Sequence, residues 1–274
     1  MMSTRDFLPE INRLSIVSAA IMLAFSLTQL VSFPVQPLSF ELLGILIEFR
    51  IDFRTIITAL TAILAAAGMD WLILSHPQRD PESNRWIYTR HWIIPVFTTI
   101  VISVALNTFT GSPFGWVTFV FGSLLLIAVL IAEYNMIVPD DNDHPLARIG
   151  LTGLTFALFL MLSIALYSRN IRLYIRLPIL AIGAMMTISR SLLLRTGNWH
   201  FYWALVNSLI VVQVGVGLHY LPLTSIQNGL ILVGLAYAMT AVATGITESR
   251  KGAAFWAEPV IMMTLMVIMS VVWR

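Results

Sequence analysis

Nine apolar stretches, each about the length that crosses a bilayer, dominate this sequence of 274 residues. A helix needs roughly 20 mainly apolar residues to span a membrane. Only 11% of the residues are charged, against roughly 25% in a soluble domain. We therefore predict an all-α integral membrane protein, a polytopic bundle of about nine (eight to nine) transmembrane helices. The expected spans are 12–32, 54–75, 92–108, 115–135, 146–168, 173–195, 200–220, 226–247 and 256–273.

The basic residues predict the orientation of these spans. With the amino terminus in the cytoplasm, ten of the 16 basic residues lie on the inner side and six on the outer side. Cytoplasmic loops carry the excess of Lys and Arg, so we expect a cytoplasmic amino terminus. The net charge of only +2 gives no basis for nucleic-acid binding.

The order of the spans indicates a single polytopic membrane domain over residues 1–274, with a hint of internal duplication. After a first helix at 12–32, spans in 54–168 and 173–273 would repeat the same orientations as four plus four helices. His91 and Trp92 open the third span, as Trp199 and His200 open the seventh. Repeats of this kind occur in transporters, and we predict a pseudo-repeat here.

The stretch ILIEFRIDFR, residues 45–54, differs from its apolar surroundings because apolar and charged residues alternate in it. A period of two is typical of a strand, and a lone strand cannot cross lipid because its backbone amides would be unsatisfied. We expect a short extramembrane β-like segment at about 38–54, turned at Gly44. It can be a hairpin that caps the helix ends, an interfacial helix, or an exposed edge that binds a partner or a second copy. The candidate partner-binding edge consists of Glu48, Phe49, Arg50, Ile51, Asp52 and Phe53.

Two charged residues lie inside expected spans, where burial of a charge is expensive. Asp70 and Arg190 are each about five residues from the inner end of a span. Their equal depth makes them a candidate intramembrane ion pair. Alternatively, Arg190 extends to the lipid head groups and a neighbouring hydroxyl binds Asp70. The small residues 65–68 just before Asp70 predict close helix packing.

Several polar residues are expected on the inner side of the membrane, and they raise the alternative of an intramembrane hydrolase. No HExxH, GxSxG or paired-histidine motif supports that chemistry, so no catalytic residue is assigned. The sequence has no cysteine, which excludes disulfides and thiolate metal sites. We expect no cofactor and no metal. The inner-side residues are Asp70, His76, His91, Glu133, His144, Arg190, His200, Glu248 and Glu258.

Four segments, AAAGMDWLILSHP, RHWIIP, AEYNMIVPDD and GLHYLPL, resemble a family of uncharacterised bacterial multi-pass membrane proteins, a domain of unknown function. The likeness runs over most of the chain. It implies a location in the bacterial cytoplasmic membrane and supplies no activity and no functional residues.

Few polar residues lie near the middle of the membrane, which disfavours a pathway for hydrophilic solutes. We therefore favour a non-enzymatic membrane component that binds a partner or a lipid. One alternative is a transporter of a lipid or small amphipathic solute. The second is an intramembrane hydrolase that uses Asp70 and the inner-side histidines. The expected partners are membrane lipids, with a protein partner or a homo-oligomer left open.

Overall fold

The structure, a computed structural model, describes residues 9–30, 36–42, 45–51, 53–77, 85–109, 112–137, 145–168 and 171–272. Nine α-helices, one 3₁₀ helix and two strands form in these parts of the chain. The α-helices are α1 (Ile11–Leu30), α2 (Phe53–Leu74), α3 (Ile93–Thr108), α4 (Pro113–Asn135), α5 (Pro145–Ser168), α6 (Leu173–Thr196), α7 (Phe201–His219), α8 (Ser225–Thr247) and α9 (Ala253–Val272); the 3₁₀ helix is η1 (Arg85–Trp92) and the strands are β1 (Gln36–Leu42) and β2 (Ile45–Ile51).

Eight of the described helices are long and apolar enough to cross a membrane. They begin with α2, and the second of them is Ile87–Thr108, which combines most of η1 with α3. Helix α1 contributes a shorter apolar stretch, Ile11–Leu27. The predicted polytopic helical bundle is confirmed, and the chain is a multi-pass membrane protein.

The chain forms two compact units, unit 1 at Met1–Asp141 and unit 2 at Asn142–Arg274. This boundary falls at a different loop from the boundary of the predicted pseudo-repeat near residues 168–173. The single polytopic domain and the pseudo-repeat both stay predictions.

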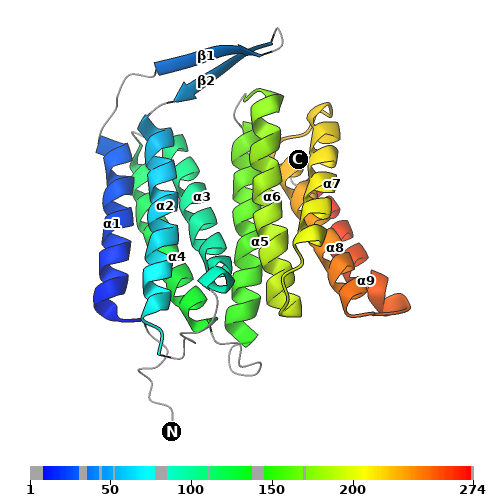
Figure 1. Ribbon diagram of the computed structural model, residues 1–274. Coiled ribbons are helices and arrows are strands. Elements are labelled where there is room, and N and C mark those ends of the chain that lie inside the picture. Colours follow the sequence, from blue (N-terminus) through cyan, green and yellow to red (C-terminus); the bar gives the residue numbers. More distant parts are fainter. Residues whose placement is uncertain are drawn as a thin grey trace. The chain divides into compact units, whose positions relative to one another are not determined.

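Unit 1 contains α1 to α4, in which α2 packs between α1 and α3, and α4 packs against α3 and α1 (Figure 1). Its core includes Ile21 and Phe25 of α1, Met69 and Leu72 of α2, and Leu126 of α4. The small residues before Asp70 pack closely, as predicted, because a Cβ atom added at Gly68 would overlap the side chain of Val17.

Strands β1 and β2 join α1 to α2 and pair antiparallel, with Gln36 opposite Ile51 and Leu42 opposite Ile45. Backbone pairing of this kind confirms the predicted β-like segment and favours a hairpin over an interfacial helix. The connecting residues 43 and 44, and with them the expected turn at Gly44, lie outside the described residues.

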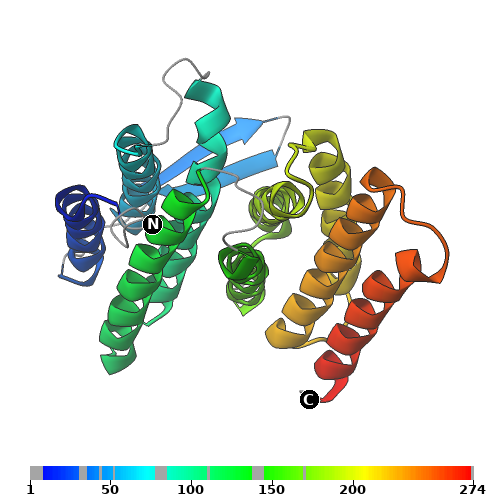
Figure 2. The same ribbon diagram turned by 90° about the horizontal axis from the view of Figure 1, so that it is seen from below.

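Unit 2 contains α5 to α9, and α8 is its central helix, packed against α5, α6, α7 and α9 (Figure 2). Helix α8 begins with a capping box. The Gln227 backbone N–H donates to the Thr224 hydroxyl, and the Thr224 backbone N–H donates to the Gln227 side chain at 2.8 Å. Gly197 ends α6 in the left-handed region at φ 72°, a conformation that favours glycine. Helix α9 lies at the edge of the unit, mainly against α8.

Candidate functional site

A pocket of about 720 Å³ opens within unit 2, between α5, α6, α8 and α9. This volume lies in the range of roughly 300–1,000 Å³ that is typical of ligand-binding pockets. The pocket reaches the end of the unit at which α5 and α9 begin and α6 and α8 end. Every residue that lines it belongs to unit 2, so one compact unit forms the complete site.

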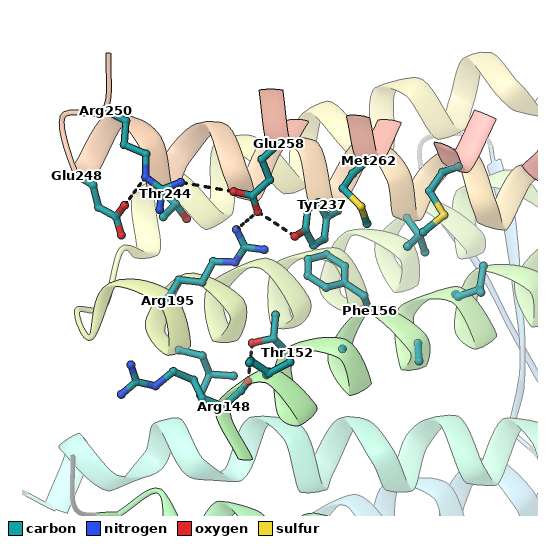
Figure 3. Close-up of a pocket in the computed structure, with 17 residues that line it drawn as sticks. Arg148, Thr152, Phe156, Arg195, Tyr237, Thr244, Glu248, Arg250, Glu258 and Met262 are labelled. Atoms are coloured by element: carbon teal, nitrogen blue, oxygen red, sulfur yellow. Dashed lines mark hydrogen bonds and ion pairs between the residues drawn. The ribbon is translucent and has the colours of Figure 1, made fainter. Parts of the chain in front are cut away.

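Five charged side chains line the pocket at that end of the unit (Figure 3). Three are arginines and two are glutamates, which leaves one net positive charge. The five residues come from the first turn of α5, the second turn of α9, the last turn of α6, and the end of α8 with its following loop. They are Arg148, Arg195, Glu248, Arg250 and Glu258.

The Glu258 carboxylate is the centre of this charged group. Arg195 Nη1 donates to Glu258 Oε1 at 2.7 Å, and the Tyr237 hydroxyl donates to the same oxygen at 2.9 Å. Arg250 Nη1 lies 3.5 Å from Glu258 Oε2, and Arg250 Nε donates to Glu248 at 2.6 Å. The Arg195 guanidinium also lies over the Tyr237 ring, 4.8 Å from its centroid. Three donors from three elements therefore converge on one carboxylate.

The lining becomes apolar with distance from this charged end. Along α5, Arg148 and Thr152 are followed at four-residue intervals by Phe156 and Leu160, and residues four apart share a helix face. Twelve residues of α-helix rise about 18 Å, so this stripe runs far into the helical bundle.

Helices α8 and α9 show the same polarity order as α5. On α9 the pocket is lined by Glu258 and then by Met262 and Met266. On α8, Glu248 and Thr244 lie at the charged end and Val233 lies at the apolar end. Three helices therefore give the pocket one charged end and one apolar end.

The loop between α8 and α9 determines where Glu258 lies. Ser249 and Gly252 both adopt positive φ angles, 54° and 74°, and turn the chain back so that α9 packs along α8. A Cβ atom at Gly245 would lie 2.7 Å from the Phe255 ring, and one at Gly234 would lie 2.7 Å from Met266. These two glycines let α9 approach α8 closely and bring Glu258 over the pocket.

Asp70 and Arg190, the predicted ion pair, are both buried, with exposed fractions of 8% and 1%. Asp70 lies on α2 in unit 1, and Arg190 lies on α6 in unit 2. Their pairing stays a prediction.

The predicted partner-binding edge falls mainly on β2. Glu48, Phe49, Arg50 and Ile51 belong to the strand, Asp52 lies outside the described residues, and Phe53 begins α2. In the part of the chain that the structure describes, β1 and β2 form a sheet of two strands. One edge of β2 is therefore unpaired there, and partner binding stays a prediction.

The inner-side polar residues form two separate groups. In unit 1, His91 Nδ1 lies 2.9 Å from Glu133 Oε2, and the His76 ring packs 4.6 Å from the Tyr134 ring. In unit 2, Arg250 binds both Glu248 and Glu258.

Two further histidines of the inner-side set contribute to neither group. His200 is the N-cap residue of α7, and His144 lies outside the described residues. Among the described side chains, no group of three His, Asp or Glu residues could hold a metal ion.

Sequence reasoning missed Arg148, Arg195 and Tyr237 as site residues. The two arginines look like ordinary basic residues at span ends. The predicted orientation of the spans puts both arginines and Arg250 on the same side of the membrane, and this was the one signal in the sequence. The orientation does not tell which helices are neighbours.

Fold and site together define a multi-pass membrane protein with an amphipathic pocket in its second unit. Residues 33–273 match a family described as a protein of unknown function, DUF5656, and the chain belongs to this family. The predicted resemblance to an uncharacterised family is thereby confirmed, while bacterial origin stays a prediction. No curated protein and no solved structure matches the chain.

Proposed function

We propose that this protein is a non-enzymatic, lipid-binding component of the membrane and that unit 2 holds one lipid with an anionic head group. The polarity order of the pocket carries this proposal. A lipid has a charged end and an apolar end, and the pocket has both within one cavity of about 720 Å³. The head group would lie among the arginines, and the chain would lie along Phe156, Leu160 and Met266.

Arg195 is the main expected contact for the head group. Within the described part of the chain, its one hydrogen bond to a carboxylate uses Nη1. A guanidinium binds carboxylate or phosphate through two parallel N–H groups. The pocket's single net positive charge also suits an anion better than a neutral head group.

The threonines of the pocket support binding over catalysis. The Thr152 hydroxyl donates to the Arg148 carbonyl at 2.8 Å, and the Thr244 hydroxyl donates to the Thr240 carbonyl at 2.9 Å. Both hydroxyls are thus directed to their own helices. Among the described lining residues there is also no histidine to act as a base.

The distribution of basic residues and the family resemblance support the location that we propose. We place the protein in a bacterial cytoplasmic membrane with its amino terminus in the cytoplasm, because that side receives the larger share of Lys and Arg. The charged end of the pocket then faces the inner leaflet. Only 11% of the span of α9 is buried, so a lipid could reach the pocket sideways past α9.

The test is purification of the full chain in a mild detergent, followed by native mass spectrometry of bound lipids. We expect wild-type protein to carry one anionic lipid and Arg195→Gln to lose most of it. Arg172→Gln is the matched control, because Arg172 is an exposed arginine at the opposite end of the same helix. Equal lipid content in wild type and Arg195→Gln would contradict the proposal.

A labelling experiment tests whether the lipid lies in the pocket. The sequence has no cysteine, so Met262→Cys introduces a single thiol on the pocket wall. Added anionic lipid should slow its reaction with a maleimide several-fold. Met269→Cys, on the exposed face of the same helix, should react at an unchanged rate. Equal protection of both thiols would indicate general coating by lipid.

The hairpin supports a second candidate function, the binding of a protein partner or second copy. The supporting observation is the unpaired edge of β2 in the described sheet, since such an edge can accept a strand. Proline at Ile51 would remove a backbone donor from β2. We expect Ile51→Pro to abolish association without lowering membrane insertion. Association that survives this change would exclude the edge.

A further inference from the structure

This inference rests on the proposed function and concerns the class of lipid. In the pocket, Arg195, Tyr237 and Arg250 surround an anion, the Glu258 carboxylate. The same donors are the ones that a head group needs. A lipid anion at this position therefore competes with Glu258.

We infer that Glu258 occupies the head-group subsite and that the ligand, a lipid phosphomonoester, displaces it. Glu258 thereby acts as a specificity-determining residue. The structure allows the exchange because the Glu258 side chain is 34% exposed and can turn into water without crossing the core. Its partner Arg250 keeps the closer contact to Glu248, 2.6 Å against 3.5 Å.

Only a head group that binds these donors more strongly than the Glu258 carboxylate does can displace it, so Glu258 selects among head groups. A carboxylate carries one charge on two oxygens, and a phosphodiester also carries one charge, so a phosphodiester lipid gains little by replacing Glu258. A phosphate monoester carries about −1.5 to −2 charges at pH 7 and has three strong acceptor oxygens. Displacement of Glu258 releases three donors, from Arg195, Tyr237 and Arg250. The number of released donor groups therefore equals the number of acceptor oxygens on a phosphate monoester.

The experiment measures the affinity of purified full-length protein for lysophosphatidic acid, a single-chain phosphomonoester, and for lysophosphatidylglycerol, a phosphodiester of the same chain length. We expect wild type to prefer the phosphomonoester at least ten-fold. Glu258→Gln removes the competing charge at constant size. It should bind both lipids at least five-fold more tightly and reduce the preference between them.

Glu10→Gln is the control, because Glu10 is an exposed glutamate that pairs with Arg13 and does not line the pocket. Its affinities should stay within about two-fold of wild type. If Glu258 only held Arg195 in place, Glu258→Gln would bind more weakly than wild type. A weaker or unchanged affinity would therefore overturn the inference.

Two further arms complete the test. Glu258→Asp shortens the competing side chain and carries the same expectation, tighter binding than wild type, if Glu258→Gln does not fold. Inorganic phosphate at millimolar concentration should not displace lysophosphatidic acid, and effective displacement would show a site for free phosphate and overturn the lipid assignment.

Failure of the inference and failure of the proposed function are distinguishable. The lipid-binding function itself is contradicted if wild type binds neither lipid. It is also contradicted if the Arg195→Gln variant binds both lipids as tightly as wild type does. Only the role of Glu258 is contradicted if Arg195→Gln lowers the lipid affinity as expected but Glu258→Gln does not raise it.

Discussion

His91 at the end of η1 and Glu133 at the end of α4 are buried together, with 2.9 Å between His91 Nδ1 and Glu133 Oε2. Their side chains are 2% and 0% exposed. Arg90 Nε donates to the other ring nitrogen of His91 at 3.4 Å, so Nδ1–H is the group that donates to Glu133. This hydrogen bond connects two helices of unit 1 across 42 residues of sequence.

Removal of either partner should destabilise unit 1. Glu133→Leu takes away the acceptor of a buried donor, and a loss of about 1–3 kcal/mol is typical of such a change. We expect a similar loss for His91→Leu and a smaller than additive loss for the double variant, because the second change removes a group that is already without this partner. The measurement is unfolding in detergent for the four proteins. Additive losses would show that the two residues act independently.

Gly68 should tolerate no larger side chain. An added Cβ would overlap the branched side chain of Val17 on α1, and overpacking typically costs about 1–3 kcal/mol. Gly68→Ala is therefore expected to lower the unfolding temperature. Gly217→Ala in α7 is the matched control, since no atom lies within 4 Å of its added Cβ, and it should gain about 0.5–1 kcal/mol from helix propensity. Equal effects of the two changes would contradict this account of α1–α2 packing.

The stability of unit 1 should fall in mildly acidic solution because of His76, which follows the end of α2. Burial lowers the pKa of His76 below its usual value of 6.5. Well above pH 6.5 the side chain is neutral in both states, so it contributes no pH dependence there. Below pH 6.5 the unfolded chain takes up the proton first, and the free energy of unfolding decreases as the pH falls towards the lowered pKa.

A variant separates this effect from other titrating groups. His76→Phe keeps an aromatic ring against Tyr134, 4.6 Å away in the wild type, and removes the titration. Unfolding midpoints measured from about pH 8 to about pH 5 should therefore decrease more steeply for wild type than for His76→Phe. Parallel curves for the two proteins would refute a role for His76.

The proposed pair of Asp70 and Arg190 makes a prediction about rescue. If the predicted pair forms, Asp70→Asn should destabilise the protein, since breaking a buried pair costs about 3–5 kcal/mol. Arg190→Gln in the same chain should then restore part of the loss. Unfolding of the two single variants and the double variant gives the answer, and simple additivity would count against pairing.

The helices could be predicted closely from the sequence, and the hairpin could be anticipated. Predicted and observed helix ends agree within about three residues, as for 173–195 against Leu173–Thr196, because a bilayer imposes a length on apolar segments. The alternation in residues 45–54 also predicted the strand Ile45–Ile51. Both signals are local, so one sequence was enough.

The pocket could not be predicted in the same way, because its residues are far apart in the sequence. Arg195 and Glu258 are separated by 63 residues and meet at 2.7 Å. Hydropathy gives the end of each span but no information about which spans are neighbours. The turn at Ser249 and Gly252 and the close approach at Gly245 bring α9 to α8, and only the folded chain reveals them.

Helix α9 has one main helical neighbour, α8, yet it supplies a whole wall of the pocket through Glu258, Met262 and Met266. A ligand in the pocket would therefore take the place of a missing packing partner for α9. Loss of the ligand and unfolding of unit 2 should then occur together. Detergents that strip lipids should release α9 first. Retention of the native lipid should decide whether the purified protein is intact.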